Sequence, residues 1–195
     1  LPFSQRFIHR LGVEGRAGYI FQTNPFLEYS NHQYKPMKNA YAGHLKYSFQ
    51  LRPHTVADQA YIGAYQGIGV GYFNFGNPEE LGNPLAVYLF QGGRIAQFSP
   101  RISLNYEWNF GASFGWKPYD DAVNPLNKMM GSKMNAYLNA DFFLDWRVTR
   151  EVDFTAGLSL THFSNGNTKF PNAGLNAVGL RAGLTYNFGR KSAEM

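Results

Sequence analysis

Residues 101–116 alternate between two kinds of side chain at every position. The even positions are all apolar, and the odd positions are polar, charged or glycine. A period of two places successive side chains on opposite faces of a β-strand. Strands in globular proteins usually run about five to six residues, so an alternation this long is unusual. The segment therefore predicts a long strand with one apolar and one polar face.

Seven further segments repeat this alternation with more noise. Residues 85–98 are the weakest of them, because they are apolar on both faces and contain Gly92 and Gly93. No low-complexity linker or composition break divides the chain, so we expect one domain over residues 1–195. The other predicted strands cover residues 7–22, 38–52, 61–74, 133–148, 151–163 and 175–188.

The length of the strands decides between two architectures. A strand that spans a bilayer needs about 9–11 residues, and the predicted strands reach that length. Charged residues make up only 16% of the chain, whereas a soluble domain carries about 25%. We therefore predict an all-β fold, an eight-stranded antiparallel up-and-down transmembrane β-barrel, with its apolar faces toward lipid. The alternative is a soluble, lipocalin-like lipid carrier with its apolar faces inward.

The polar faces of the predicted strands carry charged side chains that would point into the barrel. We expect them to form a structural network, because so narrow a barrel is filled by side chains. Asp141, Asp145 and Asp153 also fall on the inward faces. The other members expected in the network are Arg10, Glu14, Arg16, Glu107, Arg147 and Arg181.

Composition excludes several kinds of site. The chain has no cysteine, so neither a disulfide nor a thiolate metal site is possible. His9, His32, His44 and His54 show no ligand spacing, so we expect no metal.

There is no apolar run of about 18 residues that would predict a transmembrane helix. The N-terminal "LPFSQRF" lacks a basic stretch followed by an apolar one, so we expect no signal peptide in it.

The connections between the predicted strands alternate in length. Outer-membrane barrels have long extracellular loops and short periplasmic turns, which gives the barrel an orientation with both termini in the periplasm. The connection at 53–60 is an exception to the alternation. The long connections are 23–37, 75–84, 117–132 and 164–174, and the tight ones are 99–100 and 149–150.

The sequence "THFSNGNT" at residues 161–168 stands at the extracellular end of a strand. The apolar face of that strand runs from Val152 to Leu160, and two further steps of two reach His162 and Ser164. Both side chains should therefore face the lipid. Polar side chains are costly on such a surface unless they have a function. The alternative is a polar pair where the strand meets its loop, since His-x-Ser is a short pattern that arises by chance.

The longer stretch "THFSNGNTKFPNAGLN" resembles the signature of the outer-membrane lipid A 3-O-deacylase (PagL) family. That family hydrolyses an ester-linked acyl chain of lipopolysaccharide. The specific likeness covers about sixteen residues, and the strand pattern extends a weaker, fold-level likeness to the whole chain. The residues that carry it are His162, Ser164, Asn165, Lys169, Pro171, Asn172, Gly174 and Leu175.

The resemblance implies a role for each matched residue. Ser164 would be the nucleophile, and His162 would be its general base. The backbone N–H of Gly166 and the side chain of Asn172 would form the oxyanion hole, with Asn165 in a supporting role. The implied partners are lipid A, lipopolysaccharide and outer-membrane lipid, with no nucleic acid, no metal and no cofactor. The net charge of +5 suits an anionic partner but does not choose one.

One position departs from the family pattern. The family has an orienting glutamate where this chain has Asn176. Asn176 falls on the outward face of the last strand beside His162, and its amide oxygen can accept a hydrogen bond from the imidazole. It cannot supply a full negative charge. A loop carboxylate from Glu28, Glu79 or Glu80 is the alternative orienting acid.

The departure also leaves a second function open. A catalytically weak or inactive barrel of the same fold would have a structural or lipid-binding role. The sequence decides neither the preferred acyl chain, nor the choice between lipid A and a phospholipid ester, nor the oligomeric state.

The lysines of the loops either contact lipid A phosphates or are ordinary solvated charges; they are Lys117, Lys128, Lys133 and Lys169.

Overall fold

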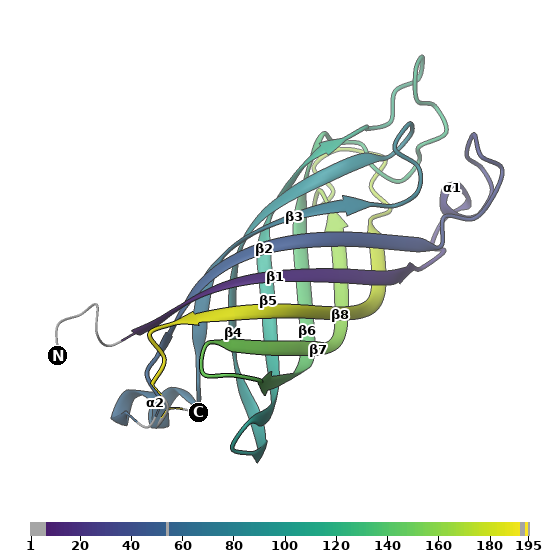
Figure 1. Cartoon of the computed structure of the whole chain (residues 1–195). Coiled ribbons are helices and arrows are strands. Elements are labelled where there is room, and N and C mark those ends of the chain that lie inside the picture. Colours follow the sequence, from purple (N-terminus) through teal and green to yellow (C-terminus); the bar gives the residue numbers. More distant parts are fainter. Residues whose placement is uncertain (1–6, 54, 192–193, 195) are drawn as a thin grey trace.

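The computed structural model describes residues 7–53, 55–191 and 194. Its eight strands form a closed barrel in sequence order, each antiparallel to its neighbours (Figure 1). The predicted eight-stranded up-and-down barrel is thus confirmed. The strands are β1 (Phe7–Ile20), β2 (Asn39–Leu51), β3 (Tyr65–Asn74), β4 (Gly82–Ser99), β5 (Ile102–Trp116), β6 (Met134–Arg147), β7 (Val152–Ser164) and β8 (Leu175–Phe188).

Two short helices lie at opposite ends of the barrel (Figure 1). The helix α1 (Pro25–Glu28) belongs to the connection between β1 and β2, at the end with the long loops. The helix α2 (Val56–Tyr61) lies at the end where β1 begins and β8 ends. Neither helix in the described part of the chain is long or apolar enough to cross a bilayer.

The observed strand boundaries differ from the predicted ones most clearly in β3 and β4. The strand predicted from residue 61 begins at Tyr65, because the preceding segment folds as α2. Thr55 caps that helix by accepting a hydrogen bond from the Asp58 N–H at 3.1 Å, and Ile62 ends it in the left-handed conformation. Ile62 therefore does not belong to the apolar face of a strand. The weakest predicted strand is the longest observed one, with 18 residues from Gly82.

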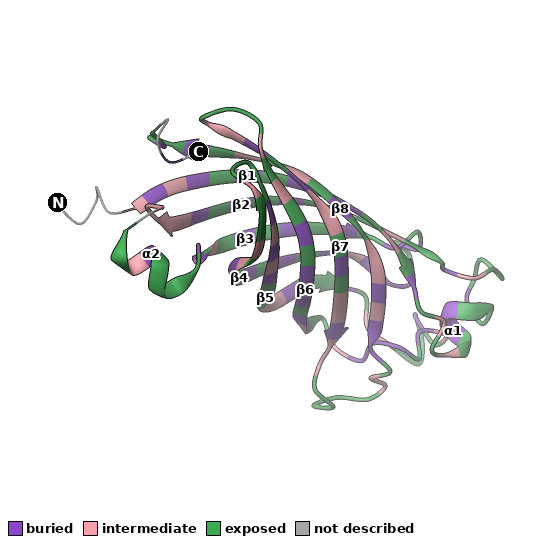
Figure 2. Cartoon of the chain, turned by 90° about the horizontal axis from the view of Figure 1, so that it is seen from below, coloured by how far each residue is buried: buried purple, intermediate pink, exposed green. Residues whose placement is uncertain are grey.

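The outer face of the barrel is apolar, as the alternation predicts. Buried and exposed residues alternate along the strands (Figure 2). Large apolar side chains such as Leu11, Leu45 and Phe142 are exposed, whereas Glu14, Lys46 and Asp141 are buried. This distribution is the reverse of that in a soluble barrel, so it rejects the lipocalin-like alternative.

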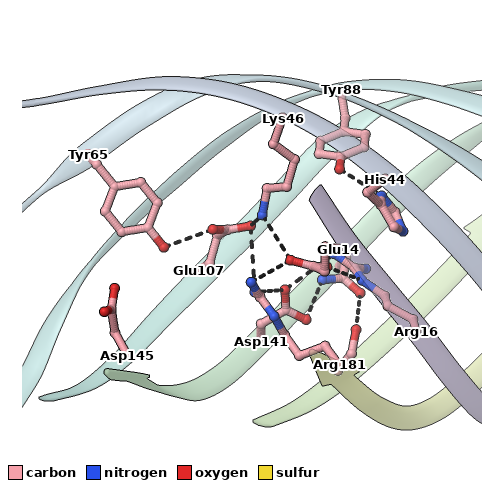
Figure 3. Close-up of polar contacts among 12 residues, drawn as sticks. Glu14, Arg16, His44, Lys46, Tyr65, Tyr88, Glu107, Asp141, Asp145 and Arg181 are labelled. Atoms are coloured by element: carbon pink, nitrogen blue, oxygen red, sulfur yellow. Dashed lines mark hydrogen bonds and ion pairs between the residues drawn. The ribbon is translucent and has the colours of Figure 1, made fainter. Parts of the chain in front are cut away.

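The middle of the barrel holds a charge network made of Glu14, Arg16, Lys46, Glu107, Asp141 and Arg181 (Figure 3). Three cations face three anions, and all six side chains are buried. Arg16 Nε lies 2.6 Å from a Glu14 oxygen, and Arg181 Nη1 lies 2.7 Å from Asp141 Oδ2. Lys46 pairs with Glu107, and Arg181 pairs with Glu14. The predicted interior network is therefore present.

Nearer the short turns, a second cluster joins the strands to the tail after β8. Arg190 pairs with Asp153 at 2.7 Å, and Arg10 lies 3.7 Å from the same carboxylate. Arg147 was expected in the interior network. It lies instead at the rim, because it ends β6, and its Nη1 donates to the Glu194 carbonyl oxygen at 3.0 Å.

The half of the interior near the long loops is apolar, which the sequence did not predict. Buried rings stack there into an aromatic plug of Phe73, Phe75, Trp116, Tyr137 and Phe163. Trp116 was predicted to face lipid but is only 3% exposed. Gly115 has a φ of +93°, which breaks the alternation and turns Trp116 inward.

We predict that Arg181→Ala destabilises the folded barrel by about 3–5 kcal/mol, because it leaves buried carboxylates without their cation. Urea unfolding in lipid vesicles measures this change. The control is Arg150→Ala, which removes a half-exposed partner of Glu151 and should cost at most about 1 kcal/mol. Equal losses in the two variants would contradict the structural role of the network.

Candidate active site

Three of the predicted site residues meet on the outer face of β7 and β8, at the end of the barrel that carries the long loops. His162 lies on β7 directly opposite Asn176 on β8. Ser164 is the last residue of β7 and lies opposite Ala136 on β6. All three side chains are half-buried. The outward direction predicted from the alternation places them in one cluster.

Two hydrogen bonds join the three side chains. His162 Nδ1 lies 2.6 Å from Asn176 Oδ1, and His162 Nε2 lies 3.1 Å from Ser164 Oγ. Asn176 Oδ1 only accepts hydrogen bonds, so a neutral His162 must carry its proton on Nδ1. The lone pair on Nε2 then faces the serine hydroxyl. This is the arrangement in which an imidazole removes a proton from a nucleophile.

The residues beside His162 and Asn176 anchor the site from inside the barrel. Phe163 and Leu175 are paired across β7 and β8, point inward, and are fully buried. The Phe163 ring lies 5.0 Å from both Phe73 and Trp116, measured between ring centroids. Because side chains alternate along a strand, burial of Phe163 in the aromatic plug fixes the outward direction of its two neighbours. Phe163 was not predicted from the sequence as part of the site.

The loop after Ser164 is held in shape by asparagine side chains. The Asn165 N–H donates to Asn172 Oδ1 at 3.1 Å, and Asn172 Nδ2 donates to Asn167 Oδ1 at 2.9 Å. Gly166 and Asn167 both have positive φ, 64° and 62°. Glycine and asparagine tolerate that conformation best. The Gly166 N–H donates no hydrogen bond within the described residues.

The preceding long loop, residues 117–133, is docked against this loop. Met130 forms an isolated bridge with Asn172, and the Ala173 N–H donates to the Met129 carbonyl oxygen at 3.0 Å. Asn165 Nδ2 donates to Ser132 Oγ at 2.9 Å. Both methionines are fully buried against the aromatic plug. Ser132 was not predicted from the sequence, since nothing in its spacing links it to Asn165.

An outer groove leads from the His–Asn pair across the lipid-facing surface. Its volume is about 550 Å³, within the range of pockets that hold small ligands. The groove reaches both His162 and Asn176. Its other lining side chains are mainly apolar and include Phe21, Trp108, Phe110, Leu138, Ala140 and Leu160.

Among the candidate loop carboxylates and lysines, Glu80 and Lys128 have other partners. Glu80 Oε2 accepts hydrogen bonds from Asn77 Nδ2 at 2.6 Å and from the His32 N–H at 3.0 Å. The Nδ1 partner of His162 is Asn176, not a carboxylate. Lys128 Nζ lies 3.9 Å from the centre of the Tyr119 ring, a cation–π contact.

A closed barrel with an apolar outside, a charged interior and a His–Ser pair facing lipid defines an outer-membrane β-barrel with a hydrolase-like site. The family model described as Lipid A 3-O-deacylase (PagL) matches residues 10–185. The chain belongs to this family. Family and fold together place it in the bacterial outer membrane.

Two solved structures share the fold. The crystal structure of the outer membrane enzyme PagL aligns with a TM-score of 0.59 and 15% identity, over 88% of this chain and 97% of that one. Neisserial surface protein A aligns with a TM-score of 0.52 and 11% identity, over 93% of this chain and 96% of that one. At such low identity these alignments support the fold alone. No curated protein sequence matches the chain.

We predict that Gly174→Ala slows the hydrolysis of a chromogenic ester about tenfold or more, because small displacements of catalytic groups are costly. A Cβ atom at this position would lie 3.3 Å from His162 Cε1, and Gly174 has a φ of +74°. Initial rates in detergent measure the effect.

The control is Gly76→Ala, at a φ of +78° with nothing within 4 Å of the added Cβ atom. It imposes the same backbone strain, about 1–2 kcal/mol, far from the site. Equal rates for the two alanine variants would mean that Gly174 does not position the imidazole.

Proposed function

We propose that this protein is a serine esterase that hydrolyses the ester-linked acyl chain at the 3-O position of lipid A in the outer leaflet. The observation that carries the proposal is the 3.1 Å contact between His162 Nε2 and Ser164 Oγ on the lipid-facing surface. Family membership supports lipid A as the substrate. The chain acts as one domain and uses no cofactor, since serine, histidine and water suffice for ester hydrolysis.

The first half of the proposed reaction transfers the acyl group to the enzyme. Ser164 Oγ attacks the ester carbonyl carbon while His162 Nε2 takes the hydroxyl proton. The tetrahedral intermediate then collapses, and the bond to the sugar oxygen breaks. His162 returns the proton to that oxygen, which leaves as the free 3-hydroxyl of lipid A. The acyl chain remains on Ser164.

The second half releases the acyl chain. A water molecule gives a proton to His162 Nε2 and attacks the acyl carbonyl carbon. Collapse of this intermediate breaks the bond to Ser164 Oγ, which regains the proton from His162. The products are a fatty acid and the original enzyme.

The oxyanion of both intermediates needs hydrogen-bond donors close to Ser164. We assign this role to the Gly166 N–H and to Asn172 Nδ2. Asn165 supports them, because its N–H fixes the Asn172 amide oxygen at 3.1 Å and so sets the direction of the amide group. Donors held in place before reaction stabilise the transition state without reorganising.

Asn176 orients His162 but leaves the imidazolium without a neutralising charge. Its 2.6 Å contact with Nδ1 fixes the tautomer and the ring plane. An aspartate or glutamate at this position would also stabilise the imidazolium that forms when Ser164 loses its proton. The neutral amide is compatible with the alternative function, a weak or inactive barrel with a structural or lipid-binding role, but family membership does not favour that alternative.

We predict that lipid A from cells expressing the protein loses a 3-linked acyl chain and that Ser164→Ala abolishes the loss, because the variant has no nucleophile. Mass spectrometry of extracted lipid A measures the change. The control is Ser159→Ala, on the same strand, whose hydroxyl faces inward and donates to Asn139 Oδ1 at 2.9 Å. It should remain active. Unaltered lipid A in cells with the wild-type barrel would overturn the deacylase assignment and favour the inactive barrel.

We predict that Asn176→Ala lowers kcat about a hundredfold, since the imidazole loses its orienting partner. Asn176→Asp keeps the shape and adds a charge, and Asn176→Glu installs the residue of the family. Both should raise kcat, by about tenfold for ~1.4 kcal/mol of imidazolium stabilisation. Steady-state kinetics on detergent-solubilised lipid A test this. Unchanged rates in all three variants would remove Asn176 from the mechanism.

A further inference from the structure

We infer that the outer groove selects the acyl chain of the substrate by its length and that Trp108 forms the far wall of this groove. This inference rests on the proposed function and adds a residue that sets chain-length specificity. The groove faces lipid; its lining includes the His162–Asn176 pair and extends from there across β6 to Trp108 on β5. An acyl chain whose ester carbonyl lies at Ser164 would therefore run along the groove toward Trp108.

Strand register defines the path of the groove. His162 pairs with Leu138 on β6, and Leu138 pairs with Phe110 on β5. One step of two residues away from the loops, Leu160 pairs with Ala140, which pairs with Trp108. The groove thus crosses β7, β6 and β5 while it descends toward the middle of the membrane.

A small residue forms the floor of the groove, and large residues form its sides. Ala140 lies between Leu160 and Trp108 in the same row across the strands. Leu138 and Phe142, its neighbours on the outer face of β6, are both large and exposed. A side chain larger than alanine at residue 140 would fill the path between the catalytic pair and Trp108.

A hydrogen bond fixes the Trp108 side chain at the far wall of the groove. Trp108 Nε1 donates to Gln91 Oε1 at 2.5 Å, and the two residues are direct cross-strand partners on β5 and β4. A buried or lipid-facing indole N–H normally requires such a partner. Gln91 holds the Trp108 ring at the β4 side of the groove, where an acyl chain would have to end or turn.

The register gives the length that the groove can hold. Ser164 and Trp108 are two strands and four residues apart, through Ala136 and Ala112. Strand spacings of ~4.8 Å and a rise of ~3.4 Å per residue separate their Cα atoms by roughly 17 Å. With carbon–carbon bonds of ~1.5 Å in a zigzag, an extended chain advances about 1.3 Å per carbon, so that distance corresponds to about thirteen carbons.

Selection along the groove must come from packing. Lipid tails are as apolar as the groove, so moving a chain from the membrane into it gains little hydrophobic free energy. A chain that fits gains close contacts with Leu138, Ala140 and Leu160, whereas a longer one collides with Trp108. A smaller residue in place of Trp108 should therefore favour longer acyl chains, and a larger residue in place of Ala140 should favour shorter ones.

The test is a competition among 3-O-acylated glucosamine phosphates with chains of about eight to eighteen carbons, mixed in one detergent. Mass spectrometry of the released fatty acids gives the ratio of long-chain to medium-chain product. This ratio reports specificity and is independent of the amount of folded enzyme. Trp108→Ala should raise it about tenfold, and Ala140→Leu should lower it about tenfold.

The matched control is Trp146→Ala. Trp146 is also an exposed tryptophan on the outer face, 49% against 46% for Trp108, but it lies outside the groove. Its loss should leave the product ratio unchanged. Release that depends on Ser164, with the same ratio in wild type, Trp108→Ala and Ala140→Leu, would overturn this inference alone. No Ser164-dependent release from any ester would overturn both this inference and the proposed function.

Discussion

The packing of Phe163 inside the barrel determines what lies outside it. Its ring is fully buried in the aromatic plug, so strand alternation turns His162 and Ser164 toward the lipid. The paired Leu175 does the same for Asn176 on β8. A site on the membrane surface thus depends on a rigid apolar core behind it. Met129 and Met130 extend this core into the loop that contacts Asn172 and Ala173.

The interior near the long loops and the interior at the middle of the barrel have different structural roles. Near the long loops, the aromatic plug fills the barrel and supports the candidate site. In the middle, equal numbers of cations and anions satisfy one another and join strands that are distant around the barrel, as Lys46 on β2 does with Glu107 on β5. Among the described residues, the cavity beside this charge network holds only about 30 Å³, too little for a lipid, which supports the proposed site on the outside of the barrel. In the proposed reaction, the substrate reaches this site by lateral movement in the membrane.

Sequence periodicity predicted the strands and the meeting of His162, Ser164 and Asn176, because a period of two fixes which face each residue occupies. Periodicity predicted the wrong face for Trp116, because the positive φ of Gly115 interrupts the alternation. It also predicted too early a start for β3, because the helix α2 precedes that strand. Contacts between loops carry no period. Ser132 and Asn165, 33 residues apart, could be joined only by the folded structure.

The most direct test of a lipid-facing nucleophile is the labelling of Ser164 by a fluorophosphonate attached to a lipid tail and confined to the bilayer of vesicles that contain the protein. Peptide mass spectrometry identifies the labelled residue. We predict a covalent adduct on Ser164 that requires His162 and forms while the reagent stays in the membrane. Adducts on other residues only, or labelling of Ser164 only by a water-soluble reagent, would contradict a catalytic site that faces the lipid.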